Sequence, residues 1–161
     1  MKKNITIKLN GELRNVDVEP TEILLDVLRD KLSVKSPKYG CGRGDCGTCT
    51  IIMNGKTVRS CIILAIEADG QEILTVEGLS KEGLTPLQEA FIENNSFQCG
   101  FCASGIVMTA TELLLKNPDP TEHEIKEAIA GNLCRCTGYT PIIEAIAKTA
   151  KDKKKKKAGK K

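Results

Sequence analysis

Residues 40–49 read Gly40-Cys41-Gly42-Arg43-Gly44-Asp45-Cys46-Gly47-Thr48-Cys49, and Cys61 follows after eleven further residues. Glycine lacks a Cβ atom and adopts positive φ readily, so a loop of this kind can turn several backbone N–H groups towards one point. Such donors stabilise negative charge on sulfur. We therefore expect Gly42, Gly44 and Gly47 to supply backbone contacts to an anionic metal centre held by the cysteines.

The spacing of the four cysteines indicates which centre this is. Cys41-x4-Cys46-x2-Cys49 with a later Cys61 is the ligand spacing of plant-type 2Fe-2S ferredoxins. Residues 42–47 also satisfy the dinucleotide pattern G-x-G-x-x-G, but that pattern should follow a strand and open a helix. Here it leads into the β-rich residues 50–53, so nucleotide binding is not expected.

The residues around this loop predict a small mixed sheet with one helix. Asn10-Gly11 and Asn54-Gly55 are hairpin turns between alternating apolar runs, and Cys61 would extend from the last strand of the second hairpin. Residues 21–32 have helical spacing, with Thr21 as the expected N-cap. The expected strands are residues 5–9, 13–18, 50–53, 57–62 and 73–76.

The second half of the chain changes to helical periodicity. Thr85-Pro86 with Gln88, and Thr121 with Glu124, are capping boxes, and Thr140-Pro141 is another helix start. Short loops between the helices favour an antiparallel four-helix bundle. The expected helices are residues 86–95, 103–116, 121–130 and a fourth beginning at 140. The expected domains are residues 1–80, residues 81–150 and a disordered Lys-rich tail at 151–161.

A second cysteine set lies in two loops of this predicted bundle. Cys99-x2-Cys102 separates the first two helices, and Cys134-x-Cys136 separates the last two. The two loops emerge at the same end of an antiparallel bundle, so the four thiolates can converge on one centre. The N-termini of two helices would place partial positive charge beside it. Taken alone, this set also suits an all-thiolate zinc site.

Composition narrows the class of protein. The chain has 161 residues, eight of them Cys, no Trp and only 3% aromatic residues, so neither half can form a core around large rings. No export signal follows Met1, and no apolar run is long enough to cross a bilayer. We expect a cytoplasmic protein with reduced thiols, in which clustered cysteines are metal ligands rather than disulfides.

Charge and the remaining motifs exclude other classes. The net charge of +3 comes from residues 151–161, which contain eight Lys and one Asp without aromatic residues, so nucleic-acid binding is not expected. Docking of this tail to an acidic partner or a membrane surface is an alternative. The only histidine, His123, is expected on the surface, and one histidine is too few for a Rieske centre. No paired nucleophile and base and no P-loop is found, so we expect no catalytic residue on this chain.

These motifs together resemble the 2Fe-2S subunit of the molybdenum hydroxylases, a family that includes xanthine dehydrogenases and aldehyde oxidoreductases. The combination is specific, and the resemblance extends from residue 3 to about residue 150. One departure is Ala103-Ser104, where the family usually has Thr-Pro. The matching stretches are residues 40–50, Ser60-Cys61, Gln98-Cys99-Gly100-Phe101-Cys102 and Gly131-Asn132-Leu133-Cys134-Arg135-Cys136-Thr137-Gly138-Tyr139.

The resemblance implies an α+β fold in which a β-grasp, plant-type ferredoxin-like domain precedes a four-helix bundle, each with one 2Fe-2S cluster. It implies that Gln98 and Cys136 lie against the molybdopterin of a large partner subunit, although Gln98 could be a solvated loop amide. Electrons would pass from molybdenum through the bundle cluster and the ferredoxin cluster to FAD on another subunit of a hetero-oligomer. The substrate could be a purine, an aldehyde or an N-heterocycle, with xanthine or a related purine as the default.

Two rival functions remain at this point. A freestanding two-cluster carrier would exchange electrons with several partners, although a single-cluster carrier needs only about the first 80 residues. An adaptor protein whose fold is held together by zinc would contain metal but would be colourless.

Overall fold

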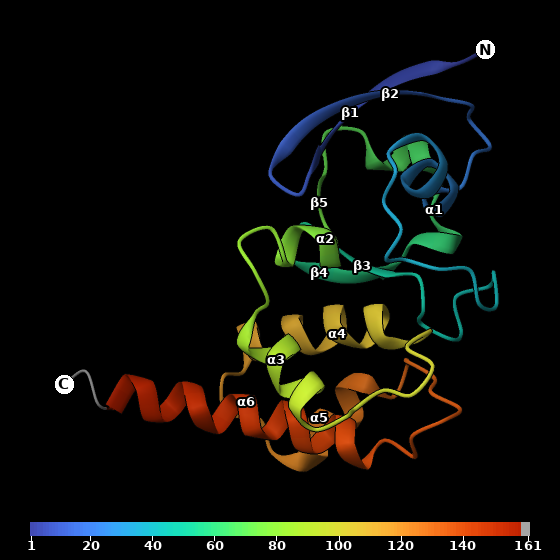
Figure 1. Cartoon of the computed structure of the whole chain (residues 1–161). Coiled ribbons are helices and arrows are strands. Elements are labelled where there is room, and N and C mark those ends of the chain that lie inside the picture. Colours follow the sequence, from blue (N-terminus) through green and yellow to red (C-terminus); the bar gives the residue numbers. More distant parts are fainter. Residues whose placement is uncertain (159–161) are drawn as a thin grey trace.

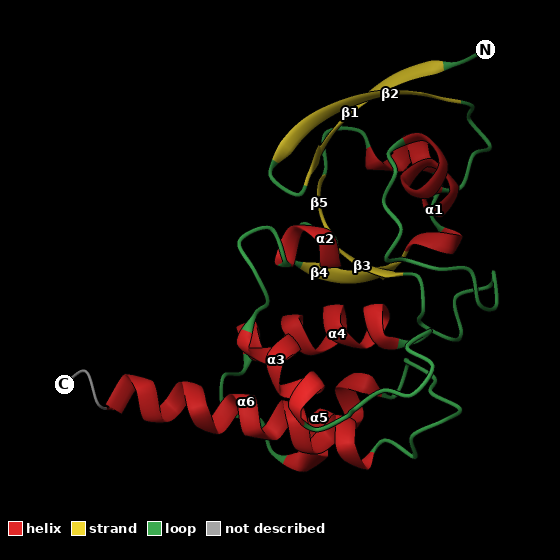
Figure 2. Ribbon diagram, in the orientation of Figure 1, coloured by secondary structure: helices red, strands yellow, loops and turns green. Residues whose placement is uncertain are grey.

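The computed structural model describes the backbone of residues 1–158 and the side chains of residues 1–152. The fold is α+β: a mixed sheet with short helices forms one half, and helices α3 to α6 form the other (Figures 1 and 2). The sheet half contains β1 (Lys3–Leu9), β2 (Glu12–Val18), α1 (Leu24–Asp26) with the π-helical turn η1 (Val27–Lys31), β3 (Thr50–Met53), β4 (Lys56–Arg59), the 3-10 turns η2 (Ser60–Ile62) and η3 (Ala65–Ala68), β5 (Glu72–Leu74) and α2 (Val76–Leu79). The helical half contains α3 (Pro86–Glu93), α4 (Ala103–Lys116), α5 (Glu122–Ile129) and α6 (Thr140–Ala158).

The sheet has the strand order β2-β1-β5-β3-β4, in which β1 and β5 are parallel and the other neighbours antiparallel. Both predicted hairpins are confirmed. Asn10 and Gly11 have φ of 51° and 87°, and Asn54 and Gly55 have φ of 49° and 78°. Two consecutive positive φ values give the turn whose twist matches that of the paired strands.

The first helix begins later than the sequence predicts. Ile23 is extended and forms an isolated β-bridge with Leu64, and the Leu24 N–H donates to the Ile63 carbonyl at 2.8 Å. Because this long-range pairing holds the backbone extended, the helix starts at Leu24. Thr21 is therefore not its N-cap.

The helix starts in the second half follow the predicted capping. The Thr85 and Thr121 side chains accept from the backbone N–H of Gln88 and Glu124, and both capping boxes are complete. Helices α4 and α6 begin at residues 103 and 140, as predicted. These starts depend on groups three residues apart, so local sequence is sufficient to specify them.

Helix α6 also corrects one expectation. It continues to Ala158, so residues 151–158 are helical rather than part of a disordered tail; residues 159–161 lie outside the described residues. Lys is a good helix former, and positive charge is favourable near a helix C-terminus, so a packed helix can extend through a Lys run.

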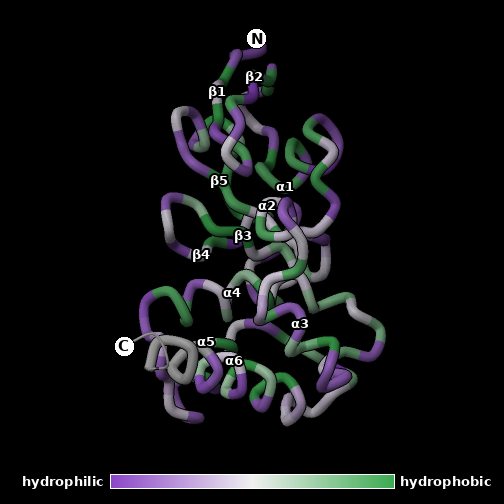
Figure 3. The backbone as a smooth tube through the Cα atoms, turned by 60° about the vertical axis from the view of Figure 1, so that its left-hand side comes forward, coloured by the Kyte–Doolittle hydropathy of each residue, from purple (hydrophilic) through white to green (hydrophobic). Residues whose placement is uncertain are grey.

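Two hydrophobic cores hold the halves. One fills the space between the sheet and α1, and the other joins α3, α4, α5 and α6 around Ile106, Ile125, Ile142 and Ile146, each fully buried. Figure 3 shows hydrophobic residues along β3 and β5 in the first core. Helix α4 packs both against β3 and against α5, so it is the element on which the two halves meet (Figure 1).

Candidate metal centres

The first cysteine set converges from a loop and a turn. Cys41, Cys46 and Cys49 lie between η1 and β3, and Cys61 lies in the 3-10 turn η2 rather than in a strand as predicted. Strand β4 ends at Arg59, and Ser60, the first residue of η2, stays bonded to Cys49: its N–H and hydroxyl both donate to the Cys49 carbonyl, at 3.3 and 2.8 Å. This turn brings Cys61 beside Cys49.

Backbone N–H groups surround the sulfur atoms of this first set. The N–H groups of Arg43 and Cys46 point at the Cys41 Sγ, with donor–sulfur distances of 3.5 and 3.4 Å. These donors lower the pKa of the Cys41 thiol to about 6. Burial raises the pKa of Cys61 to about 11, together with the neighbouring Cys49, while the Gly44 N–H opposes the rise.

The predicted glycine positions adopt the backbone that this loop needs. Gly42, Gly44 and Gly47 have φ of 67°, 87° and 75°, a region that other residues rarely adopt. The loop can therefore present consecutive N–H groups to one side, where they favour an anionic centre.

The second cysteine set joins the two predicted loops. The Cys136 and Cys99 Sγ atoms lie 3.7 Å apart, although the two residues are separated by 37 positions. Cys102 is buried at the start of α4, and Cys134 lies near it. The four thiols therefore meet at one end of the helical half, as the sequence predicts.

The thiols of the second set are held in unequal surroundings. Burial raises the pKa of Cys102 to about 12, with Cys134 contributing. Burial also acts to raise the pKa of Cys134, but the Thr137 hydroxyl, 3.1 Å from its sulfur, and nearby N–H groups lower it overall. The Phe101 N–H lowers the pKa of Cys99, whereas the Cys99 sulfur raises that of Cys136.

The chemistry of the eight side chains fits two-iron centres. All eight cysteines are free thiols, and within each set they meet in pairs. A 2Fe-2S cluster distributes four thiolates over two irons. The pairs are Cys41 with Cys46, Cys49 with Cys61, Cys99 with Cys136, and Cys102 with Cys134.

The other residues singled out from the sequence lie as follows. Gln98 is exposed beside the second set, where its Nε2 donates to the Cys136 carbonyl at 3.1 Å. His123 is on the surface, as expected, with its Nε2 3.5 Å from Glu127 Oε1. The sequence thus brings Gln98 to the centre and leaves His123 away from it.

The contact between the two halves was not predicted. Asn132, only 1% exposed, donates from Nδ2 to the Gly47 carbonyl at 3.0 Å. A Cβ atom on Gly105 would lie 2.1 Å from the same carbonyl oxygen, so α4 and the first cysteine loop touch through their backbones. The flanking motif marks Asn132 in the sequence, but nothing local indicates a partner 85 positions away.

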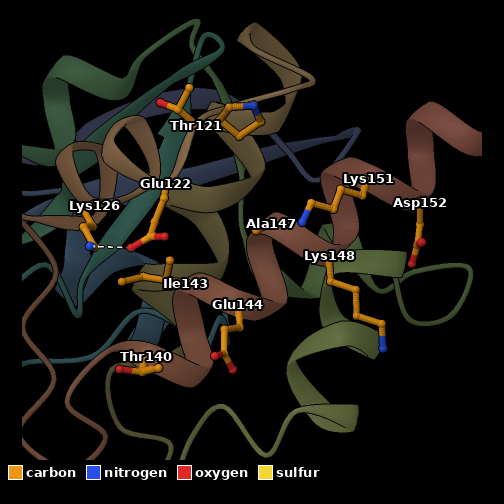
Figure 4. A pocket seen from close by; sticks show the side chains of 11 residues that line it. Thr121, Glu122, Lys126, Thr140, Ile143, Glu144, Ala147, Lys148, Lys151 and Asp152 are labelled. Atoms are coloured by element: carbon orange, nitrogen blue, oxygen red, sulfur yellow. Dashed lines mark ion pairs between the residues drawn. The ribbon is translucent and has the colours of Figure 1, made fainter.

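A surface hollow of about 740 Å³ lies elsewhere, between α5 and α6 (Figure 4). Glu122 and Lys126 form an ion pair of 2.6 Å at its edge, and Ile143 and Ala147 give it an apolar side. Its lining contains no cysteine, so it is separate from both thiol sets. Among the described residues, no helix is both long enough and apolar enough to span a bilayer.

Comparison with protein families agrees with this geometry. A model described as a 2Fe-2S iron-sulfur cluster binding domain matches residues 7–79, and a second, described as a 2Fe-2S binding domain, matches residues 75–147. The fold and the two thiol sets therefore define an iron-sulfur protein with two 2Fe-2S-binding domains.

Individual relatives narrow the kind of iron-sulfur protein. The nicotine 6-hydroxylase small subunit of Paenarthrobacter nicotinovorans is 52% identical over 142 residues, 88% of this chain and 86% of the relative. The nicotinate dehydrogenase small FeS subunit of Eubacterium barkeri is 48% identical over 146 residues, 90% and 93% of the two chains. A chain of quinoline 2-oxidoreductase from Pseudomonas putida 86 superimposes with a TM-score of 0.90 at 45% identity, covering 92% of this chain and 93% of that one.

This chain belongs to the family of 2Fe-2S iron-sulfur subunits of the molybdenum hydroxylases. The resemblance seen in the sequence is thereby confirmed. Its role is that of an electron-transfer subunit of an oxidoreductase.

Proposed function

We propose that each cysteine set binds one 2Fe-2S cluster and that the chain conducts electrons from a molybdopterin-bearing large subunit to an FAD-bearing subunit. When bound, each cluster supplies a site that takes up and returns a single electron. The observation that carries this proposal is the pairing of thiols within each set, with two pairs for two irons. The proposed ligands are Cys41, Cys46, Cys49 and Cys61 for the first cluster, and Cys99, Cys102, Cys134 and Cys136 for the second.

We assign the two clusters to two domains. Residues 1–80 would form a β-grasp domain, in which the sheet and α1 enclose one core. Residues 81–150 would form a four-helix bundle, which the common core of α3, α4, α5 and α6 supports. The free thiols support a cytoplasmic location, where cysteines stay reduced and available to metals.

Exposure supports the order of the two clusters in the path. In the second set two cysteines are exposed, one is half-buried and one, Cys102, is buried, whereas in the first set Cys41 and Cys46 are half-buried and the other two are buried. Phe101, beside Cys99, is 46% exposed despite its size. The second set is therefore the more exposed of the two and has a large apolar side chain at the surface beside it, which supports its placement towards a large partner subunit; Gln98 holds the Cys136 backbone there.

The test of the ligand assignment is a pair of matched substitutions in the full-length chain. Wild-type protein should contain iron and acid-labile sulfide for two clusters and give two distinct EPR signals after reduction. Cys136→Ala should abolish only one signal, and Cys41→Ala only the other. Loss of both signals, or of neither, in either variant would contradict the partition. A colourless protein containing zinc would support the adaptor instead.

The test of the assembly is purification at native expression. We expect a stable hetero-oligomer with two larger subunits that contain molybdopterin and FAD. A lone diffusing chain that reduces several acceptors would support a freestanding carrier.

We further propose that the complex acts on a pyridine-type N-heterocycle rather than on xanthine. Similarity to subunits named for nicotine, nicotinate and quinoline enzymes supports this class, since all three compounds contain such a ring. Dye reduction by the purified complex should be fastest with a nicotinate- or quinoline-type substrate. Faster turnover of xanthine or an aldehyde would refute the assignment.

A further inference from the structure

The two cysteine sets are joined by a seam at which the backbones of the two halves approach closely. A Cβ atom on Gly105 would lie 2.1 Å from the Gly47 carbonyl oxygen, and one on Gly47 would lie 2.4 Å from the Gly131 carbonyl oxygen. Backbone therefore packs directly on backbone between the loop that holds Cys46 and the loop that holds Cys134. In Figure 1 these loops, one after η1 and the other before α6, lie on the same side of the molecule.

One backbone-to-backbone hydrogen bond crosses this seam. The Leu133 N–H donates to the carbonyl oxygen of Cys46, with a nitrogen–oxygen distance of 2.9 Å. Cys46 is a proposed ligand of the first cluster, and Leu133 precedes Cys134, a proposed ligand of the second. Only short covalent segments and this single hydrogen bond thus separate a sulfur of one set from a sulfur of the other.

The side chain of Asn132 holds this hydrogen bond in place. Its Nδ2 donates to the Gly47 carbonyl at 3.0 Å and lies 3.3 Å from the Thr50 hydroxyl, while its Oδ1 accepts from the Thr109 hydroxyl at 2.9 Å. Arg59 supports the same place, donating to the Thr50 hydroxyl at 2.6 Å and to the Gly131 carbonyl at 2.7 Å. Asn132 is thereby tied to the first loop, β3 and α4 at once.

Because Asn132 is buried, its side-chain hydrogen bonds are costly to break. A buried amide that loses its partners carries a desolvation penalty, so the side chain has one favoured position. Because Asn132 adjoins Leu133, its position sets the separation of the two loops and the length of the Leu133 to Cys46 hydrogen bond.

We infer that Asn132 is a positioning residue for electron transfer between the clusters, and that the Leu133 N–H to Cys46 carbonyl hydrogen bond is the contact that couples them. The inference depends on the ligand assignment proposed above. One electron leaves the second centre, which is oxidised, and enters the first, which is reduced. No bond forms or breaks, and the Leu133 N–H keeps its proton.

Three substitutions in the cluster-loaded, full-length chain test this role. Asn132→Ala removes all the side-chain hydrogen bonds of Asn132. Thr109→Val removes only the donor to Asn132 Oδ1 and nearly preserves the shape of the side chain. Glu112→Ala is the control, because Glu112 accepts from the Thr57 N–H at 3.0 Å across the same two halves. This control contact lies about 15 Å along α4 from Cys102, at 1.5 Å per residue.

Two measurements report on the coupling without an activity assay. One is the spin–spin splitting of the EPR signals when both clusters are reduced, and the other is the rate at which an electron equilibrates between clusters after partial photoreduction. Wild-type iron and sulfide contents should persist in every variant. We expect the splitting to be lost and equilibration to slow at least several-fold in Asn132→Ala, with a smaller change in Thr109→Val and none in Glu112→Ala.

The outcomes separate the two proposals. Unchanged splitting and rates in Asn132→Ala and Thr109→Val would overturn the role of Asn132 and leave the ligand assignment standing. The same conclusion would follow if Glu112→Ala changed the splitting and rates as much as these two variants do. If Asn132→Ala fails to load both clusters, the EPR splitting and the equilibration rate of Thr109→Val decide whether Asn132 has this role. A wild-type chain without two iron-sulfur signals would instead refute the proposed function.

Discussion

Replacing Gly105 with Ala should destabilise the protein, which is the opposite of what this change usually does in a helix. Gly105 lies in the first turn of α4. Ala is ordinarily favoured over Gly inside a helix by about 0.5–1 kcal/mol. Here the new Cβ would lie 2.1 Å from the Gly47 carbonyl oxygen and 3.0 Å from the Asn132 Nδ2, so backbone on one side would have to move.

The two opposing terms give the expected magnitude. Overpacking of a filled site costs about 1–3 kcal/mol, and a contact this short against backbone belongs at the upper end of that range. After the helix-propensity gain, a loss of about 2 kcal/mol remains, which corresponds to about 4–8 °C in Tm for a chain of this size. Thermal unfolding of the cluster-loaded protein, followed by circular dichroism and by visible absorbance, measures it.

Thr111→Ala is the matched control, since it lies in the same helix and is only partly buried. It should leave Tm unchanged or slightly raised, because Ala is the better helix former. If Gly105→Ala is as stable as the wild type, α4 and the first cysteine loop are not in backbone contact, and the seam described above is wrong.

Three further perturbations have defined outcomes. Partial burial acts to raise the pKa of Glu77, but the Ser36 and Thr75 hydroxyls lower it overall, so its carboxylate stabilises the fold at neutral pH. This contribution should fade as pH falls below 4.5 and through the lowered pKa. The free energies of unfolding of Glu77→Gln and wild type, measured by urea titration, should therefore differ at pH 7 and converge in acid. A difference that stays constant with pH would contradict this expectation. Thr137→Val removes the hydroxyl beside the Cys134 sulfur, and redox titration should show that only the second cluster becomes harder to reduce, by roughly 20–60 mV for a bond of about 0.5–1.5 kcal/mol. Ile106→Ala opens a cavity at a fully buried site and should cost about 2–5 kcal/mol in denaturant unfolding, whereas a loss below 1 kcal/mol would show that the helical core can collapse around it.

Local sequence determined much of the fold because the deciding groups are close together in the chain. Asn10-Gly11 and Asn54-Gly55 specify their hairpins through the φ values of two adjacent residues, and Thr85 and Thr121 start their helices through bonds to N–H groups three residues on. The cysteine spacing likewise indicated two centres, because four ligands divided between two short loops can reach a common point.

Elements that depend on distant partners were decided only by the tertiary structure. The extended backbone at Ile23 pairs with Leu64, which delays α1, and the bonds from Ser60 to Cys49 hold the turn that contains Cys61 beside the first cysteine loop. Neither contact leaves a periodic signal in the sequence. The helical backbone at 151–158 has the same origin, since a helix anchored in a core extends farther than its composition alone suggests.

The chain's family and its eight thiols could thus be recognised from residues 40–61 and 98–139, where short-range spacing encodes metal ligation. The seam between the two sets could not, because Asn132 meets Gly47 across the boundary between the two halves, 85 positions apart in the chain. Spacing specifies which residues can bind a metal, whereas the distance between two bound centres is a property of packing.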